Sequence, residues 1–217
     1  MEGLNKYIEH TLLKPDTKIE EIEMLCADAI KYNFAGVCIP TYFLSDVASI
    51  LNDTGIELIT VIGFPYGYNS LISKFDEAED AIAKGADHLD VVINIAAIKN
   101  NDWDTVENEI ETLVKLVRSE NKIIKVIAET GLMSEVETDL ICKIANEFRI
   151  DYLKTSTGIN GPGADVETIT SLRELLESPI KIKASGGIRT KAFAIELIEA
   201  GADRIGTSKG VELVLEP

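Results

Sequence analysis

The feature that most constrains the fold is a regular alternation of short β-branched runs with longer amphipathic stretches along the whole chain. Runs of the first kind predict strands, and stretches with helical periodicity predict helices between them. Such strict alternation indicates parallel strands joined by helical crossovers. The predicted strands are 7–11, 35–39, 58–63, 88–94, 123–129, 152–156, 180–184 and 203–206. The predicted helices are 19–32, 42–51, 71–84, 103–118, 135–148, 166–177 and 191–200.

The number of repeats distinguishes the two architectures that this alternation allows, an open doubly wound sheet and a closed barrel. Eight units favour the barrel, and 217 residues with 46% hydrophobic content are enough for one such core. Local signals agree, since Ser134 and Glu137 form a capping-box pattern, Asp102 precedes a helix, and Gly85 and Gly201 follow helix ends. We therefore expect an α/β fold, a single-domain (β/α)₈ TIM barrel over residues 1–217.

The charge of the chain limits its partners. With 21 Lys and Arg against 37 Asp and Glu, the formal net charge is −16. This excess repels nucleic acid and anionic membranes, so neither is expected as a partner. A small phosphorylated compound is still permitted, because it needs positive charge in only one pocket. The N-terminus lacks the pattern of a signal peptide, and we expect a cytoplasmic protein.

The cysteines and histidines argue against disulfide and metal chemistry. Cys26, Cys38 and Cys142 are widely spaced and odd in number, which predicts reduced thiols. The chain has two histidines, His10 and His88, and its carboxylates show no metal-ligand spacing. No metal and no cofactor are expected.

Two predicted strands carry a lysine near their carboxyl ends, where barrel enzymes build their active sites. Alternation along the strand places Lys154 opposite Leu153 and Lys183 opposite Ile182. A lysine facing the helix layer would be buried among apolar groups without a partner, so both should point into the barrel. Asp90, on another strand, would add a carboxylate that can move protons.

Two lysines on consecutive strands predict a nucleophile and its activator. At roughly 6 Å, two ammonium groups repel by about 3 kcal/mol at an effective dielectric of ~20, which is about two pKa units. Because only a neutral amine attacks a carbonyl, we expect this repulsion to favour a Schiff-base nucleophile.

Glycine-rich segments follow the last two predicted strands. Gly186 and Gly187 follow one, and Gly206, Ser208 and Gly210 follow the other. In barrels the loops after strands 7 and 8 commonly hold a phosphate group, which predicts a phosphorylated carbonyl compound as substrate.

Six segments in the same order resemble the deoxyribose-phosphate aldolase family, and together they run from about residue 7 to residue 210. They are IEHTLLKP at 8–15, TVIGFP at 60–65, DVVIN at 90–94, KTSTG at 154–158, KASGGIRT at 183–190 and RIGTS at 204–208. The resemblance implies a class I aldolase that reversibly cleaves 2-deoxy-D-ribose 5-phosphate to D-glyceraldehyde 3-phosphate and acetaldehyde.

The resemblance also implies roles for individual residues. Lys154 would form the Schiff base, while Asp90 and Lys183 would carry protons and Lys183 would tune Lys154. A homo-oligomer, either dimer or tetramer, is implied as well. The implied substrate-binding positions are Glu9, Cys38, Thr157, Gly187, Gly206 and Ser208.

The sequence departs from the family pattern at a few positions. Glu9 stands where the family usually has Asp, so a longer carboxylate must fit the same corner. Pro162 replaces the Gly or Thr of many members and predicts a stiffer loop. Longer members carry a C-terminal tail with a tyrosine, whereas this sequence ends at Pro217.

Less specific interpretations remain beside these. Lys154 alone could be a strand lysine that reaches toward solvent, Lys181 shares a face with Lys183, and Cys38 could be a packing residue. The alternative functions are another phosphate-binding barrel lyase or isomerase acting on a small phosphorylated carbonyl compound, and an inactive barrel kept as a binding module.

Overall fold

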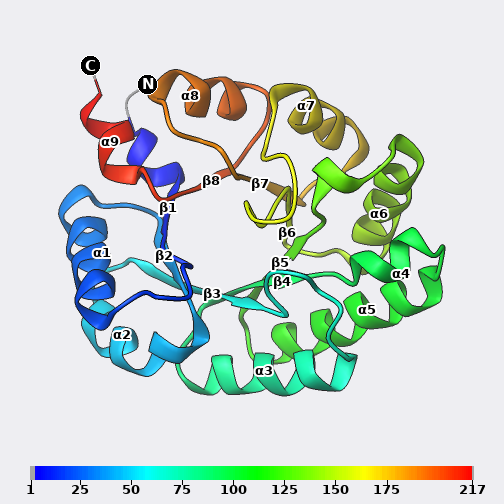
Figure 1. Ribbon diagram of the computed structural model, residues 1–217, viewed down its shortest axis with the longest axis horizontal. Helices are drawn as coiled ribbons and strands as arrows, with labels where there is room; N and C mark the ends of the chain where they lie inside the picture. The colour runs from blue at the N-terminus through cyan, green and yellow to red at the C-terminus, as the bar shows by residue number, and fades with distance from the viewer. Residues whose placement is uncertain (1–2, 217) are drawn as a thin grey trace.

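Eight parallel strands, each paired with the next along the chain, close into a barrel through the pairing of the first with the eighth (Figure 1). The computed structural model describes residues 3–216; residues 1, 2 and 217, which the single-domain expectation also covered, lie outside the described residues. The predicted TIM barrel is confirmed. The strands are β1 (Ile8–Thr11), β2 (Gly36–Ile39), β3 (Glu57–Ile62), β4 (His88–Val92), β5 (Ile123–Ile127), β6 (Tyr152–Lys154), β7 (Lys181–Ser185) and β8 (Arg204–Thr207).

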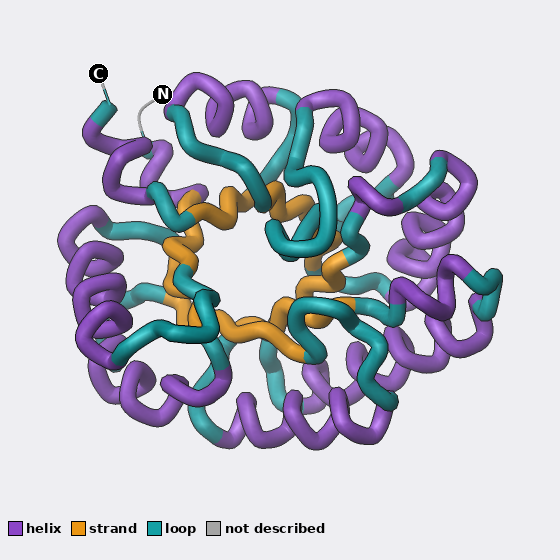
Figure 2. The backbone as a smooth tube through the Cα atoms, in the orientation of Figure 1, coloured by secondary structure: helices purple, strands orange, loops and turns teal. Residues whose placement is uncertain are grey.

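Helices surround the ring of strands on its outer side, as Figure 2 shows. All seven predicted helices are present, with ends that differ by no more than two residues. The helices are α1 (Ile19–Tyr32), α2 (Leu44–Leu51), α3 (Leu71–Ala83), α4 (Ile95–Lys99), α5 (Trp103–Ser119), α6 (Glu135–Phe148), α7 (Val166–Leu175), α8 (Lys191–Glu199) and α9 (Gly210–Leu215).

Two short helices, α4 and α9, are absent from the sequence prediction. Each has fewer than two turns, so the recurrence of apolar residues that marks a helix cannot develop within it. The predicted helix 42–51 begins instead at Leu44, because a 3₁₀ turn over Thr41–Phe43 precedes it. These differences leave the order of strands unchanged.

The predicted helix boundaries have identifiable caps. The Asp102 side chain accepts a hydrogen bond from the backbone N–H of Thr105 at 3.2 Å. Ser134 and Glu137 form the predicted capping box at the start of α6. Gly85 and Gly201 follow α3 and α8 with φ of +98° and +119°, a region that favours glycine. These caps fix where each crossover turns back toward the barrel.

The hydrophobic core lies between the strands and the helices. Outward-facing strand residues such as Val91, Val126 and Leu153 are buried together with apolar residues of the helices. The interior of the barrel is different, because it holds charged side chains where branched apolar residues are usual. The lysines, carboxylates and histidine buried inside, among the described residues, are Glu9, His88, Asp90, Lys125, Lys154 and Lys183.

Among residues 3–216, we find no helix with the length and apolar character needed to cross a lipid bilayer.

Candidate active site

Lys154 and Lys183 lie side by side inside the barrel, with Asp90 between their ammonium groups. The two lysines are direct register partners on β6 and β7. Both donate to the same oxygen, Asp90 Oδ2, over 2.8 Å from Lys154 and 2.6 Å from Lys183. The two nitrogens therefore cannot be farther apart than the sum of those distances, which is within the separation that the sequence predicts. Both side chains point inward.

A third lysine, Lys125 on β5, joins this group and was not singled out from the sequence. Its Nζ lies 3.2 Å from Asp90 Oδ1 and 3.4 Å from Glu9 Oε1. Glu9 also forms an ion pair with Lys183. Three lysines thus share two fully buried carboxylates, and the expectation of a simple repelling lysine pair was incomplete. Loss of one proton from the lysines balances the charge of this group.

The electrostatics of the group follow from burial and from these ion pairs. Burial by itself would raise the pKa of Asp90, but Lys125, Lys154 and Lys183 hold it well below its usual range. Burial would lower the pKa of Lys183, yet Asp90 and Glu9 raise it above its usual range. At neutral pH Asp90 is therefore a carboxylate and Lys183 an ammonium group. This assignment leaves Lys183 able to give a proton and Asp90 able to accept one.

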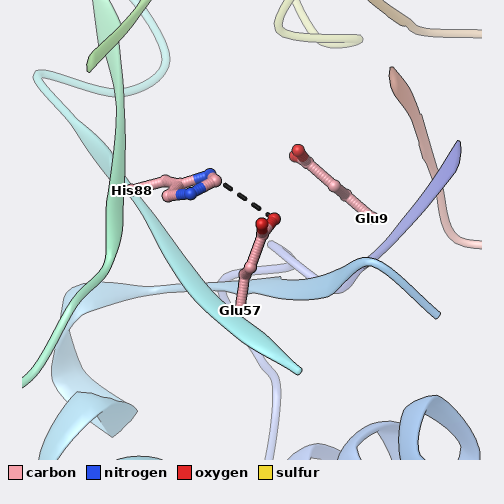
Figure 3. Close-up of side chains that lie close together, drawn as sticks. All are labelled: Glu9, Glu57 and His88. Atoms are coloured by element: carbon pink, nitrogen blue, oxygen red, sulfur yellow. Dashed lines mark ion pairs between the residues drawn. The ribbon is translucent and has the colours of Figure 1, made fainter. Parts of the chain in front are cut away.

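The polar interior continues toward the N-terminal ends of the strands, which form the floor of the barrel. His88 opens β4 and Glu57 opens β3, and Figure 3 shows both side chains directed toward Glu9. His88 Nδ1 lies 2.8 Å from Lys125 Nζ and 3.7 Å from Glu57 Oε2. Arg204 Nη2 and Nε lie 3.6 Å from Glu57 and 3.7 Å from Glu9.

The side chains of Glu9, Glu57 and His88 are close enough to suggest a metal site, since one ligand atom from each lies within 4.8 Å of the others. The charges beside them argue against it. Lys125 Nζ contacts both His88 and Glu9, so an ammonium group already neutralises the position that a cation would take. A divalent ion there would be repelled by Lys125 and by Arg204.

A pocket of about 390 Å³ opens at the carboxyl ends of β6, β7 and β8, and Lys154 lies on its wall. Among the residues predicted to bind substrate, four line the pocket, namely Thr157, Gly187, Gly206 and Ser208. Lys14 and Arg189 also line it, and their cationic side chains were not assigned a role from the sequence. Their signal was present, because both lie in segments that carry the family resemblance.

Glycine is required at Gly186 and Gly206 for different reasons. Gly186 has φ of +87°, and a Cβ there would lie 2.8 Å from the Cα of Gly163 in the loop after β6. A Cβ at Gly206 would lie 3.0 Å from Cε of Lys183. Gly206 therefore gives room to Lys183 as well as bordering the pocket. Gly187, at φ of +77°, has open space where a side chain would be.

The loop after β6, which reaches over the barrel mouth in Figure 1, is held by Glu129. Glu129 is buried, and it accepts hydrogen bonds from the Thr157 backbone N–H at 3.1 Å and from its hydroxyl at 2.5 Å. Asn160 Nδ2 donates to the same carboxylate at 3.2 Å and to the Pro65 carbonyl at 2.6 Å. These bonds fix Thr157 beside Lys154, so Glu129 is an organising residue that the sequence did not reveal.

Glu9 and Cys38 differ from the other predicted binding residues, because neither lines the pocket. Glu9 is fully buried beneath Lys183, where its carboxylate neutralises lysines instead of facing the pocket. Cys38 is fully buried and packs with Ile59 and Val61, and burial raises the pKa of its thiol. Both positions support a structural and electrostatic role.

The fold and the site together define a class: a (β/α)₈ barrel enzyme with a strand lysine facing a pocket, backed by a second lysine and a carboxylate, which suits imine chemistry on a carbonyl compound. The sequence matches the model of the DeoC/LacD family aldolases over residues 7–213. The chain belongs to this family.

Relatives and solved structures agree with this assignment. Deoxyribose-phosphate aldolase from Caldicellulosiruptor saccharolyticus is 45% identical over 97% of this chain and 96% of its own. The enzyme of that name from Brevibacillus brevis is 43% identical over 98% of this chain and 95% of its own. The deoxyribose phosphate aldolase from Aeropyrum pernix, whose tetrameric structure is described as unique, has a TM-score of 0.91 and 32% identity over 98% of this chain and 89% of that one.

Proposed function

We propose that this protein reversibly cleaves 2-deoxy-D-ribose 5-phosphate to D-glyceraldehyde 3-phosphate and acetaldehyde through a Schiff base on Lys154. The observation that carries the proposal is the position of Lys154, which borders the pocket while Asp90 and Lys183 lie behind it. The names of the relatives support the choice of substrate.

In the proposed reaction, the neutral amine of Lys154 attacks the substrate aldehyde carbon C1, and loss of water gives an iminium ion. The C3 hydroxyl gives up its proton as the C2–C3 bond breaks, and the electron pair of that bond forms an enamine. Protonation of the enamine at C2 and addition of water release acetaldehyde and restore the amine. Asp90 accepts and Lys183 donates protons in these steps, as their charge states favour.

Access from the pocket supports Lys154 as the nucleophile. Asp90 and Glu9 neutralise two of the three buried lysines, so a neutral third amine leaves the group without excess charge. Lys154 is the lysine that borders the pocket, whereas Lys125 and Lys183 are fully enclosed. A carbonyl carbon can therefore reach Lys154 only.

The phosphate of the substrate is assigned to the β7 and β8 side of the pocket. Gly187 leaves the backbone open to a close approach, Gly206 borders the pocket, and Ser208 offers a hydroxyl group. Arg189 and Lys14 add positive charge there in a chain whose net charge is −16. Charge-assisted hydrogen bonds to phosphate are among the stronger polar contacts in proteins.

We also propose that the protein is a homo-oligomer. A dimer or tetramer of this chain is supported by the tetrameric description of the Aeropyrum pernix structure. The acidic charge supports a protein that binds neither nucleic acid nor anionic membranes. We propose that it acts in the cytoplasm on a small phosphorylated aldehyde. Light scattering during size-exclusion chromatography measures the assembly.

Trapping of the imine tests the proposed function. Protein incubated with acetaldehyde and reduced with borohydride should gain one ethyl group, and peptide mapping should place it on Lys154. The Lys154→Ala variant should lack this adduct and should lose cleavage of deoxyribose 5-phosphate, measured by coupled detection of triose phosphate. Cleavage without an adduct on Lys154 would instead favour another lyase mechanism, and absence of both activities would favour a binding module.

A further inference from the structure

The barrel floor contains a second pocket that the proposed reaction does not use. It has a volume of about 410 Å³ and is lined by the first residues of several strands, among them Glu57, His88 and Tyr152. Because active sites of barrel enzymes lie at the opposite ends of the strands, polar residues at the floor need a separate explanation.

Ionisable side chains lead from the active site to this floor pocket in short steps. Asp90 Oδ1 is 3.2 Å from Lys125 Nζ, and Lys125 Nζ is 2.8 Å from His88 Nδ1. His88 Nδ1 is in turn 3.7 Å from Glu57 Oε2, a span that one water molecule can bridge. Asp90 Oδ1 and Glu57 Oε2 are buried atoms that accept no hydrogen bond from the described residues, so both have capacity for a proton or a water.

We propose that this chain is a second proton pathway, in which His88 and Glu57 pass protons between water in the floor pocket and Asp90 by way of Lys125. The proposal rests on the proposed aldolase function. When substrate fills the mouth of the barrel, the floor keeps the buried acid–base groups in contact with solvent.

The transfers balance along the chain. A protonated Asp90 gives its proton to Lys125 as the Lys125 ammonium group gives one of its own to His88 Nδ1. The resulting imidazolium ion releases the proton from Nδ1 to Glu57, and Glu57 passes it on to water in the floor pocket. Each group ends with the charge it had at the start, apart from Asp90, which returns to a carboxylate. The reverse sequence delivers a proton to Asp90.

The charge states of the floor residues suit this role. Burial, followed by the charge of Lys125, lowers the pKa of His88 to about 3, so the imidazole is neutral at rest, and an imidazolium ion formed there gives its proton up readily. Burial raises the pKa of Glu57, and the charge of Arg204 opposes this effect only in part. The pKa of this carboxyl group is therefore closer to neutral pH than usual. The charged groups around His88 are Lys125, Glu9, Asp90, Lys183 and Glu57.

Chemical rescue tests the pathway. His88→Ala should lower kcat for deoxyribose 5-phosphate cleavage by about tenfold or more, since positioned proton transfer contributes at least that much. Imidazole and methylimidazoles, which fit the space opened beside the floor pocket, should restore the rate, and the restoration should increase with the basicity of the added compound. His10→Ala is the matched control, because His10 is equally buried at 6% exposure but lies outside this chain of groups. It should show no rescue.

The proposal would be overturned by a kcat in His88→Ala within twofold of the parent, or by a loss of kcat that no imidazole restores. It would also be overturned if the restored kcat did not depend on the basicity of the added imidazole, which would indicate that the compound only fills space. Glu57→Gln, at a half-buried position, provides a second variant if His88→Ala does not fold. It should also lower kcat, and an unchanged kcat would count against the pathway. In both variants borohydride trapping of acetaldehyde on Lys154 should persist. Failure of trapping in the unmodified protein would contradict the proposed function instead.

Discussion

At the scale of single residues, the site depends on one carboxylate shared by three lysines. Asp90 accepts from Lys154 and Lys183 through one oxygen and faces Lys125 with the other. The sequence could suggest Lys154 and Lys183, because each lies near the carboxyl end of a predicted strand on its inward face, and Asp90, because it adds a carboxylate on another strand within a segment that carries the family resemblance. It could not reveal the role of Lys125, because the contact depends on the register that sets Asp90 opposite Lys125 across β4 and β5.

Lys183→Met should lower kcat for deoxyribose 5-phosphate cleavage by about 100-fold or more, because it removes a buried proton donor beside Lys154. Lys181→Met is the matched control, since it changes the same residue type on the same strand at an exposed position. Its kcat should stay within twofold of the parent. Equal losses in the two variants, measured by the coupled assay, would show that Lys183 has no special part in proton transfer.

At the scale of elements, the caps and crossovers predicted from the sequence are present because they rest on local chemistry. The start of α6 is a clear case, in which Ser134 accepts from the Glu137 backbone N–H at 3.3 Å and the Glu137 side chain accepts from the Ser134 N–H at 2.7 Å. The helices α4 and α9 were missed because five or six residues are too few to show a helical period. The part that Glu129 plays in holding the loop after β6 was also missed, since the bonds of that loop join residues from three separate segments.

Ser134→Ala should lower the free energy of unfolding by about 1 kcal/mol, the usual effect of removing such a cap, and should leave kcat unchanged. The control is Ser119→Ala, at the C-terminal end of α5, where the serine hydroxyl donates to the Leu116 carbonyl on the surface. That variant should stay within about 0.5 kcal/mol of the parent. Urea denaturation measures both changes, and an unaltered midpoint for Ser134→Ala would contradict the role of this cap.

At the scale of the whole molecule, the barrel buries titratable groups that make its stability depend on pH. The pKa of His88 is lowered from 6.5 to about 3. Between these two values His88 is therefore protonated in the unfolded chain but neutral in the folded chain. The stabilisation from His88 is complete above pH 6.5 and is lost as the pH falls toward 3, by at most about 5 kcal/mol.

The free energy of unfolding should therefore decrease from pH 6.5 to pH 5, and His88→Gln should reduce that slope. Part of the slope should remain in His88→Gln, because burial also lowers the pKa of His10. Urea titrations at a series of pH values measure the slope. Parallel curves for the parent and the variant would show that His88 is protonated equally in both states.

The ionic interior has a consequence for how this protein can change. The apolar side chains that stabilise the fold pack between the strands and the helices, whereas the reactive side chains lie inside the barrel. The two sets project from opposite faces of the same strands. Selection for heat tolerance can therefore act on one face and selection for new carbonyl substrates on the other, so gains of the two kinds should combine in a single variant with little interference.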